Sequence, residues 1–332
     1  MITHDIRGRV ALTEIGIGCA QFGNLNTVVA EEETFAATQT AWNEGVRYFD
    51  VAPHYGLGLA EERLGKAIKD LPRDEIIIST KVGRLLIPTP ERAHLVDDGG
   101  FAVPAAYRRE FDFSRDGVMR SLESSLQRLG VDYIDILYLH DPDDHWESAS
   151  TTGVQTLIEL RDQGVIKAIG VGMNQCELLT RFIQETDIDL VMLAGRFTLL
   201  EQGALDELLP AAVEKSVGIV NVGVFNSGLL SRNRPSASLH YNYSPAPEEL
   251  VVRVNAIADI CEKYGVFLPE AAIQYGRFHP AVVSTVVGVR STDQVLENLR
   301  RYRKEIPQEL WQELSEAGLS ANLTTLSKTK EI

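Results

Sequence analysis

Short apolar segments alternate with longer amphipathic segments along almost the whole chain. Each short segment is rich in Val, Ile and other apolar residues and is followed by turn-forming or charged residues, as buried strands are. The sequence predicts eight strands, at Ile15–Gly18, Tyr48–Asp50, Ile76–Lys81, Ile134–His140, Ile166–Gly170, Asp189–Leu193, Gly218–Val222 and Val282–Gly288.

The longer segments place apolar residues at helical spacing, and several have capping residues at their ends. Eight helices are expected after the strands, at Glu31–Gly45, Ala60–Lys69, Arg115–Leu129, Gly153–Gly164, Glu177–Gln184, Gln202–Lys215, Leu250–Tyr264 and Asp293–Arg303. Eightfold alternation favours a (β/α)8 TIM barrel of the α/β class over a doubly wound sheet. We expect one domain over residues 1–332, with an N-terminal β-hairpin that closes the barrel floor and extra C-terminal helices at Glu270–Phe278 and Gln308–Glu316.

Two long stretches, about 84–113 and 226–249, lack either pattern and are rich in polar residues, Pro and Gly or Asn. They are expected to be loops. Loops of this length inside a compact domain usually have a function, so we expect the first one to lie over the site.

Composition narrows the classes of function. The chain has 332 residues, with 32 basic and 47 acidic side chains and a net charge of −15, which argues against a nucleic-acid or anionic-membrane surface. Cys19, Cys176 and Cys261 form no CxxC motif, as expected of reduced thiols in the cytoplasm. No apolar stretch of membrane-spanning length and no signal-peptide pattern occurs, so a cytoplasmic soluble protein is expected.

Ionisable residues end three consecutive predicted strands. Asp50 ends the second, Lys81 the third and His140 the fourth, and Tyr55 follows Asp50 by five residues in a loop that contains Pro and Gly. Each residue alone has a structural explanation as a cap, a solvated strand end or a loop histidine. Because a barrel brings the carboxyl ends of its strands into one ring, we expect the four side chains to form a catalytic group.

Their chemistry suits acid–base catalysis. A tyrosine has a pKa near ~10, so action near neutral pH requires a shift of about three units, roughly 4 kcal/mol. The Lys81 ammonium favours the phenolate of Tyr55, and Asp50 would keep that ammonium charged and in place. His140 would orient the substrate oxygen while Tyr55 protonates a carbonyl or deprotonates an alcohol. The hydride itself would need a nicotinamide.

Three other interpretations of these motifs are weaker. Lys81 as a Schiff-base lysine leaves the Asp/Tyr pair without a purpose. The run 140–145 holds two histidines and three carboxylates, but no HExxH or CxxC partner, so no metal is expected, and His145 and Trp146 are expected to line the substrate pocket. The GxG pairs at 16–18 and 170–172 lack the third glycine of a Rossmann site.

The element Asp50-x4-Tyr55-Gly56, together with Ser79-Thr80-Lys81 and the strand-final His140, resembles the tetrad of the aldo-keto reductase superfamily. The resemblance extends from Gly16 to Asn298 and implies a nicotinamide cofactor. The residues that it places at the cofactor are Asn174, Phe225, Ser227, Gly228, Leu229, Gly288, Arg290, Gln294, Glu297 and Asn298.

Within this set, Phe225–Leu229 would form the pyrophosphate loop, and Glu297 and Asn298 would contact adenine. NADP-dependent relatives often have Lys and Arg where this chain has Gly288 and Gln294, which favours NAD, although Arg290 could still reach a 2′-phosphate of NADP. From the residues alone, the segment 288–298 could also be only a capped surface helix.

The resemblance has three departures at the nicotinamide. Met173 stands where the family has a serine, Ala194 where it has a glutamine, and Val222 where it has an aromatic residue. Asn174 keeps its place. These substitutions alter the contacts expected for the nicotinamide ring.

Segments 52–58, 79–85 and 139–142 resemble the D-threo-aldose 1-dehydrogenase group, which includes L-fucose and L-galactose dehydrogenases. This implies NAD(P)-linked oxidation of an aldose at its anomeric carbon to a lactone, with His54 and Arg84 also at the substrate. Pyridoxal 4-dehydrogenase shares much of the pattern, and pyridoxal is likewise a cyclic hemiacetal. A third interpretation, a barrel kept for cofactor sensing or partner binding, conflicts with the complete tetrad. The expected partner is a small sugar or pyridoxal, bound by a monomer or homodimer.

Overall fold

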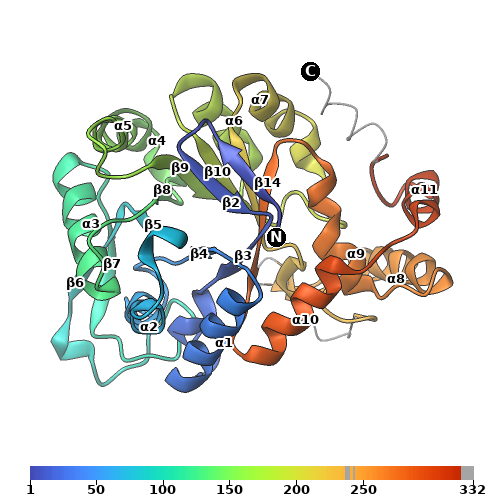
Figure 1. Cartoon of the computed structure of the whole chain (residues 1–332), viewed down its shortest axis with the longest axis horizontal. Helices are drawn as coiled ribbons and strands as arrows, with labels where there is room; N and C mark the ends of the chain where they lie inside the picture. The colour runs from blue at the N-terminus through green and yellow to red at the C-terminus, as the bar shows by residue number, and fades with distance from the viewer. Residues whose placement is uncertain (236–239, 242–243, 323–332) are drawn as a thin grey trace.

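The computed structural model, which describes residues 1–235, 240–241 and 244–322, contains a closed barrel of eight parallel strands in the order β10-β11-β14-β3-β4-β5-β8-β9 (Figure 1). The strands are β3 (Ile15–Gly18), β4 (Tyr48–Asp50), β5 (Ile77–Val82), β8 (Ile136–His140), β9 (Ala168–Met173), β10 (Leu190–Ala194), β11 (Gly218–Val222) and β14 (Val282–Gly288). The predicted barrel is therefore confirmed. Strand β9 extends three residues beyond the predicted end, to Met173.

Helices surround the barrel (Figure 1). They are α1 (Glu31–Asn43), α2 (Leu59–Ile68), α3 (Arg115–Leu129), α4 (Trp146–Ser148), α5 (Val154–Asp162), α6 (Cys176–Glu185), α7 (Leu208–Lys215), α8 (Glu248–Lys263), α9 (Leu268–Tyr275), α10 (Thr292–Arg303) and α11 (Gln308–Glu316). Side-chain caps start two of them, because Ser114 accepts from Gly117 N–H before α3 and Ser291 accepts from Gln294 N–H before α10. Within the described residues, no helix has the length and apolar character needed to cross a membrane.

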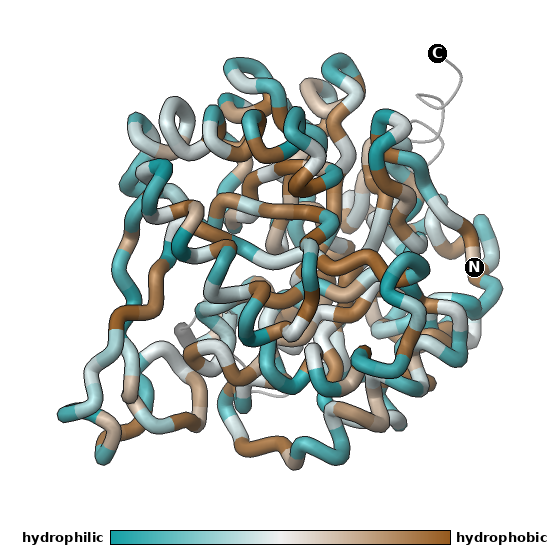
Figure 2. Tube along the Cα trace, turned by 60° about the vertical axis from the view of Figure 1, so that its left-hand side comes forward, coloured by the Kyte–Doolittle hydropathy of each residue, from teal (hydrophilic) through white to brown (hydrophobic). Residues whose placement is uncertain are grey.

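The predicted N-terminal hairpin is present. Strands β1 (Thr3–Ile6) and β2 (Val10–Thr13) pair antiparallel, and the buried side chains of Ile6, Val10 and Leu12 pack with residues from inside the barrel. These apolar side chains close the floor. A second and larger cluster fills the space between the strands and the helices, and Figure 2 shows the hydrophobic trace concentrated in the interior.

The stretch 84–113 is more than a loop. Strands β6 (Arg84–Pro88) and β7 (Tyr107–Phe111) pair antiparallel within it, with Arg84 opposite Phe111. The prediction missed this hairpin because four of the five residues of β7 are exposed and three of the five are charged, so the alternation of a half-buried strand is absent there. In 226–249, also expected to be loop, strands β12 (His240–Tyr241) and β13 (Ser244–Pro245) form a short pair, and the remainder lies partly outside the described residues.

Candidate active site

The barrel register brings Asp50 and Lys81 together. Strand β4 pairs with β5, and both side chains are almost fully buried, at 3% and 2% exposure. Lys81 Nζ donates to Asp50 Oδ2 at 2.7 Å and to the carbonyl of Val51 at 3.0 Å. The other carboxylate oxygen, Asp50 Oδ1, accepts from Ser79 Oγ at 2.7 Å. The lysine is thus held as an ammonium whose third donor is available.

That donor is directed at Tyr55. Lys81 Nζ lies 3.0 Å from the phenol oxygen and donates to it. The loop that carries Tyr55 is placed by a close backbone approach, since a Cβ on Gly23 would come within 2.5 Å of the Tyr55 carbonyl carbon. Gly56 faces Gly23 from the other side at φ +64°, where glycine is the favoured residue.

His140 completes the group at the end of β8. Its ring is 7% exposed and stands perpendicular to that of Tyr55, with 6.1 Å between the ring centroids. Nε2 lies 3.7 Å from Asp141 Oδ2, and Nδ1 is buried with no hydrogen-bond partner among the described residues. The four predicted residues therefore lie together at the carboxyl ends of β4, β5 and β8.

Burial has the largest effect on Tyr55. It raises the pKa of Tyr55 above the ordinary value, while the Lys81 charge lowers it and the Asp50 charge raises it. Burial also disfavours the Lys81 ammonium, but Asp50 and Tyr55 outweigh this, so the pKa of Lys81 lies above its ordinary value. Lys81 acts in the expected direction. The net effect raises the pKa of Tyr55, so this side chain is a neutral phenol at neutral pH.

Both nearby imidazoles are held neutral. The pKa of His140 lies well below its usual range, chiefly because the ring is buried and then because of the positive charges of Lys81 and Arg84. Burial, followed by Arg109 and Arg84, lowers the pKa of His54 to about 3. A neutral ring can donate one hydrogen bond to a substrate oxygen without adding charge.

The residues expected at the substrate divide into two groups. The His54 ring lies 5.6 Å from the His140 ring, and Arg84 Nη2 donates to Asp141 beside His140, so both reach the tetrad. His145 packs on Phe111, with centroids 4.7 Å apart, one layer further out.

Trp146 faces a different neighbour. Its ring packs on Phe182 at 4.7 Å, and the Arg181 guanidinium lies 3.8 Å from the ring centroid. Both partners belong to α6, so Trp146 joins the helix layer, and its role at the substrate stays a prediction.

Three residues of the 84–113 stretch were missed. Phe101 packs edge-on against His54 at 5.3 Å and lies 6.2 Å from the Tyr55 ring. Arg109 donates to both Asp97 oxygens, at 2.6 and 2.8 Å, and to the His54 carbonyl at 3.2 Å. Phe101 lies between Gly100 and Ala102 in a polar stretch of the sequence, and this isolated aromatic residue could have indicated a buried contact there. Nothing in the sequence paired Asp97 with Arg109.

The loop expected at the pyrophosphate has an unusual backbone. Asn226, Ser227 and Gly228 all have positive φ, at 45°, 56° and 98°, a run that turns the chain sharply after β11. Ser227 is exposed and Phe225 half-buried, whereas the Leu229 side chain is fully buried in the core. The Leu229 N–H donates to the Asn226 carbonyl at 3.1 Å, so the burial of this residue does not support a direct contact with a ligand.

The residues expected at the adenosine end gather at the start of α10. Gly288 is exposed, Gln294 Oε1 accepts from the Arg290 N–H at 3.0 Å, and the Arg290 guanidinium donates to Gln21 at 3.3 Å. Glu297 binds Arg300 and Arg301, and Asn298 is 6% exposed.

Of the residues expected near the nicotinamide, Asn174 is exposed after β9, while Met173 packs into the strand–helix core and Val222 packs against the interior cluster. Asn174 after β9 could bind the amide of a nicotinamide dinucleotide, and Arg290 before α10 could bind a phosphate. The tetrad would then face the reacting carbon. The donor set therefore fits such a cofactor.

The acidic loop after β8 has other partners. Asp141 pairs with Arg84, and Asp143 accepts from the Gln175 amide. In the described part of the chain, no three His, Cys, Asp or Glu side chains are grouped as metal ligands would be.

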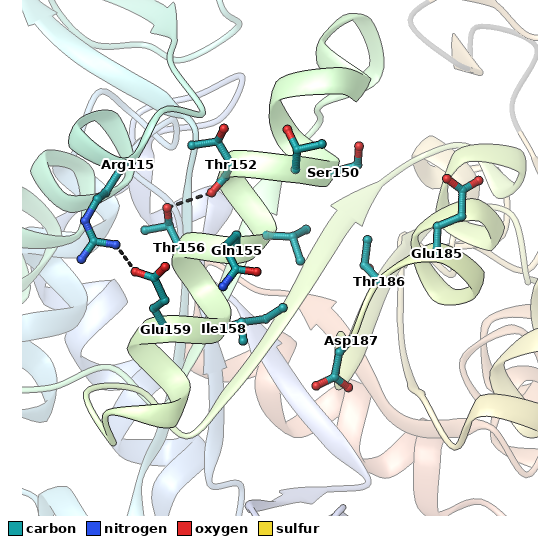
Figure 3. Close-up of a pocket in the computed structure, with 12 residues that line it drawn as sticks. Arg115, Ser150, Thr152, Gln155, Thr156, Ile158, Glu159, Glu185, Thr186 and Asp187 are labelled. Carbon is teal, nitrogen blue, oxygen red and sulfur yellow. Dashed lines mark hydrogen bonds and ion pairs between the residues drawn. The ribbon is translucent and has the colours of Figure 1, made fainter.

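One surface hollow lies away from this group of residues (Figure 3). It runs between α5 and residues 185–187 at the end of α6, and its lining includes the Arg115–Glu159 ion pair. None of its lining residues belongs to the tetrad or its neighbours.

Comparison with known proteins agrees with this geometry. Residues 14–318 match the aldo/keto reductase family. The chain is 46% identical to D-threo-aldose 1-dehydrogenase from Pseudomonas sp, over 93% of this chain and 95% of that protein. It is 38% identical to pyridoxal 4-dehydrogenase from Microbacterium luteolum, over 94% and 96% of the two chains.

Among solved structures, the fold matches a glycerol dehydrogenase from Gluconobacter oxydans with a TM-score of 0.77 at 21% identity, covering 95% of this chain and 94% of the other. That likeness supports the barrel fold alone. The family match spans nearly the whole barrel, including all eight strands. The chain therefore belongs to the aldo/keto reductase family of oxidoreductases, which use nicotinamide cofactors.

Proposed function

We propose that this protein oxidises the anomeric hydroxyl of an aldose, of the L-fucose or D-threo-aldose type, to the corresponding lactone. The observation that carries the substrate class is the 46% identity to D-threo-aldose 1-dehydrogenase over nearly the full length of both chains. The contact between Lys81 Nζ and the Tyr55 hydroxyl supports the reaction type, because it couples a phenol to a buried cation.

In this reaction the cyclic aldose loses a proton from its anomeric oxygen and a hydride from its anomeric carbon. Tyr55 takes the proton, and its phenolate is stabilised by Lys81, whose charge Asp50 maintains. His140, neutral because it is buried, donates to the anomeric oxygen and fixes its position. A bound nicotinamide supplies the hydride acceptor.

We propose NAD as the preferred cofactor. Gly288 and Gln294 supply no cation at the start of α10, and the guanidinium of Arg290 is already bonded to Gln21. A 2′-phosphate would need charge-assisted donors at this point. Arg290 remains the one residue among these three through which NADP could be accepted.

The state of the cysteines supports a cytoplasmic location. Cys19, Cys176 and Cys261 are free thiols, consistent with the reducing conditions of the cytoplasm, where a monomer or homodimer would act on a small soluble substrate.

A second candidate is oxidation of pyridoxal to 4-pyridoxolactone. The 38% identity to pyridoxal 4-dehydrogenase over 94% of the chain favours it. The reacting group is again a cyclic hemiacetal, so the roles of Tyr55, Lys81 and His140 would be unchanged.

The test is a set of initial rates at alkaline pH, with NAD and with NADP, for L-fucose, L-galactose, D-arabinose and pyridoxal. Strong NAD-linked turnover of one aldose is expected. Turnover of pyridoxal alone would replace the proposal by the second candidate. Cofactor binding without turnover of any compound would contradict both and indicate a sensing role.

A further inference from the structure

Asp141 is a charged residue beside the tetrad that the proposed reaction does not use. Its Oδ2 lies 3.7 Å from Nε2 of His140, the residue expected to orient the substrate oxygen, and 2.6 Å from Arg84 Nη2. The Asp141 side chain is 35% exposed, whereas that of Arg84 is 18% exposed. The carboxylate thus lies beside the tetrad and is partly exposed to solvent.

The backbone holds Asp141 in a rarely used conformation. Its φ is +43°, in the left-handed region, and its N–H donates to the Gly172 carbonyl at 3.0 Å across the ends of β8 and β9. For a residue other than Gly this conformation has an energetic cost, and such residues gather at functional sites. The strand ends therefore hold this side chain at the mouth of the barrel.

Hydrogen-bonding capacity is left over on both members of the pair. In the described part of the structure, only Oδ2 of the carboxylate has a partner, and that partner is Arg84. Arg84 Nε is buried without a partner, and the guanidinium lies 4.9 Å from the Phe111 ring centroid. Hairpin β6–β7 and the end of β8 therefore present a fixed acceptor next to a fixed cation.

We propose that Asp141, positioned by Arg84, is a specificity-determining residue that accepts a hydrogen bond from the hydroxyl on the carbon next to the reacting carbon. A carboxylate can only accept, and a sugar hydroxyl at that position can donate. Neighbouring hydroxyl oxygens of a sugar ring lie about one hydrogen-bond length apart, which suits an acceptor beside His140 Nε2. This inference rests on the proposed function and deepens it.

The same contact would distinguish the two candidate substrates. In pyridoxal the carbon next to the reacting carbon belongs to the aromatic ring and has no hydroxyl. Its ring hydroxyl is attached one carbon further away, so Asp141 would not make the same contact with pyridoxal. The competing explanation is an ion pair that only fastens hairpin β6–β7 to the barrel, and this would affect every substrate equally.

The experiment measures kcat/KM for the aldose that the unaltered protein oxidises best and for its 2-deoxy counterpart. For D-arabinose that counterpart is 2-deoxy-D-ribose. The variants are Asp141→Asn and Asp141→Gly, chosen because Asn and Gly tolerate the left-handed region and should fold. Asp144→Asn is the matched control, since it removes the same charge from an exposed position three residues along the same loop.

We expect both Asp141 variants to lose about tenfold to a hundredfold in kcat/KM with the aldose. With the 2-deoxy sugar they should match the unaltered protein within about threefold, and Asp144→Asn should leave both substrates unchanged. An equal loss with both sugars, or no loss with either, would overturn this inference alone. Inactivity of the unaltered protein towards every aldose would overturn the proposed function, and this inference with it.

Discussion

Buried aspartates lie at both ends of the barrel, and their surroundings differ. At the mouth, Asp50 binds Lys81 and Ser79, and the lysine continues to the hydroxyl of Tyr55, which is only partly buried. At the floor, Asp135 is fully buried between Arg73 at 2.8 Å and Lys167 at 2.7 Å, and it accepts from the Ile78 N–H.

Asp189 repeats the floor arrangement with other partners. It is fully buried before β10, it binds Arg161 at 3.2 Å and Arg7 at 3.4 Å, and it accepts from the Ile169 N–H at 3.0 Å. The floor networks end in backbone groups and in cations that fasten strands and helices together. The mouth network ends in a proton that can leave. A buried ion pair points to a catalytic role when its chain of contacts ends in a titratable group that is only partly buried, as Tyr55 is.

The largest effect is expected at the end of the mouth network. Tyr55→Phe removes only the hydroxyl, so kcat should fall by about 10²–10⁴-fold because no group replaces the acid–base function. NAD binding and the melting temperature should stay close to those of the unaltered protein. Steady-state kinetics and cofactor fluorescence titration measure this, and a variant with more than a tenth of the original rate would contradict the role of Tyr55.

At the floor we expect a substitution to lower the free energy of unfolding and to leave kcat unchanged. Asp189→Ala leaves the Arg161 guanidinium, which is 2% exposed, without its buried partner, and the free energy of unfolding should fall by about 3–5 kcal/mol. The kcat of the folded variant should be unchanged. Urea unfolding with activity assays below the transition tests this. Asp187→Asn, whose side chain is 62% exposed, is the control and should cost less than about 1 kcal/mol.

The pH dependence of the oxidation rate tests the coupling of Tyr55 to Lys81 in the mouth network. Tyr55 is a neutral phenol at neutral pH and must lose its proton to act as the base, so aldose oxidation should accelerate as the pH rises into the alkaline range. Lys81→Met removes the charge that lowers the pKa of Tyr55, so the rising limb should move up by about 1–3 pH units. Rate–pH profiles of both proteins test this, and an unmoved limb would show that Lys81 does not control Tyr55.

The smallest effect concerns His54. Burial lowers its pKa to about 3, whereas the unfolded ring has a pKa of about 6.5, so between these values the unfolded state binds more protons. Its contribution to stability is therefore complete above about pH 6.5 and declines as the pH falls towards 3. Urea midpoints of His54→Phe should fall less steeply with acid than those of the unaltered protein. His94→Gln, at an exposed position, is the matched control.

Much of the barrel and the tetrad could be predicted because both are local patterns. The apolar segment ending at Asp50 and the turn before Tyr55 lie in one stretch. Lys81 is the second-last residue of β5 and His140 the last residue of β8, and both strands have the same apolar pattern. Hairpin β6–β7 could not be predicted, since the charged run Arg108-Arg109-Glu110 interrupts the alternation of apolar and polar residues in β7. The contact of Trp146 with Phe182 was also hidden, because it joins two helices that are remote in sequence.

The sequence by itself determined which residues reach the mouth of the barrel, because strand periodicity and the parallel ring together place every strand-final side chain at one end. Tertiary structure decided what surrounds them. Phe101 and Arg109 pack on the loop of Tyr55, and Arg84 meets Asp141, 57 residues further along the chain. It also decided that burial outweighs Lys81 in setting the pKa of Tyr55, since desolvation depends on contacts between distant segments.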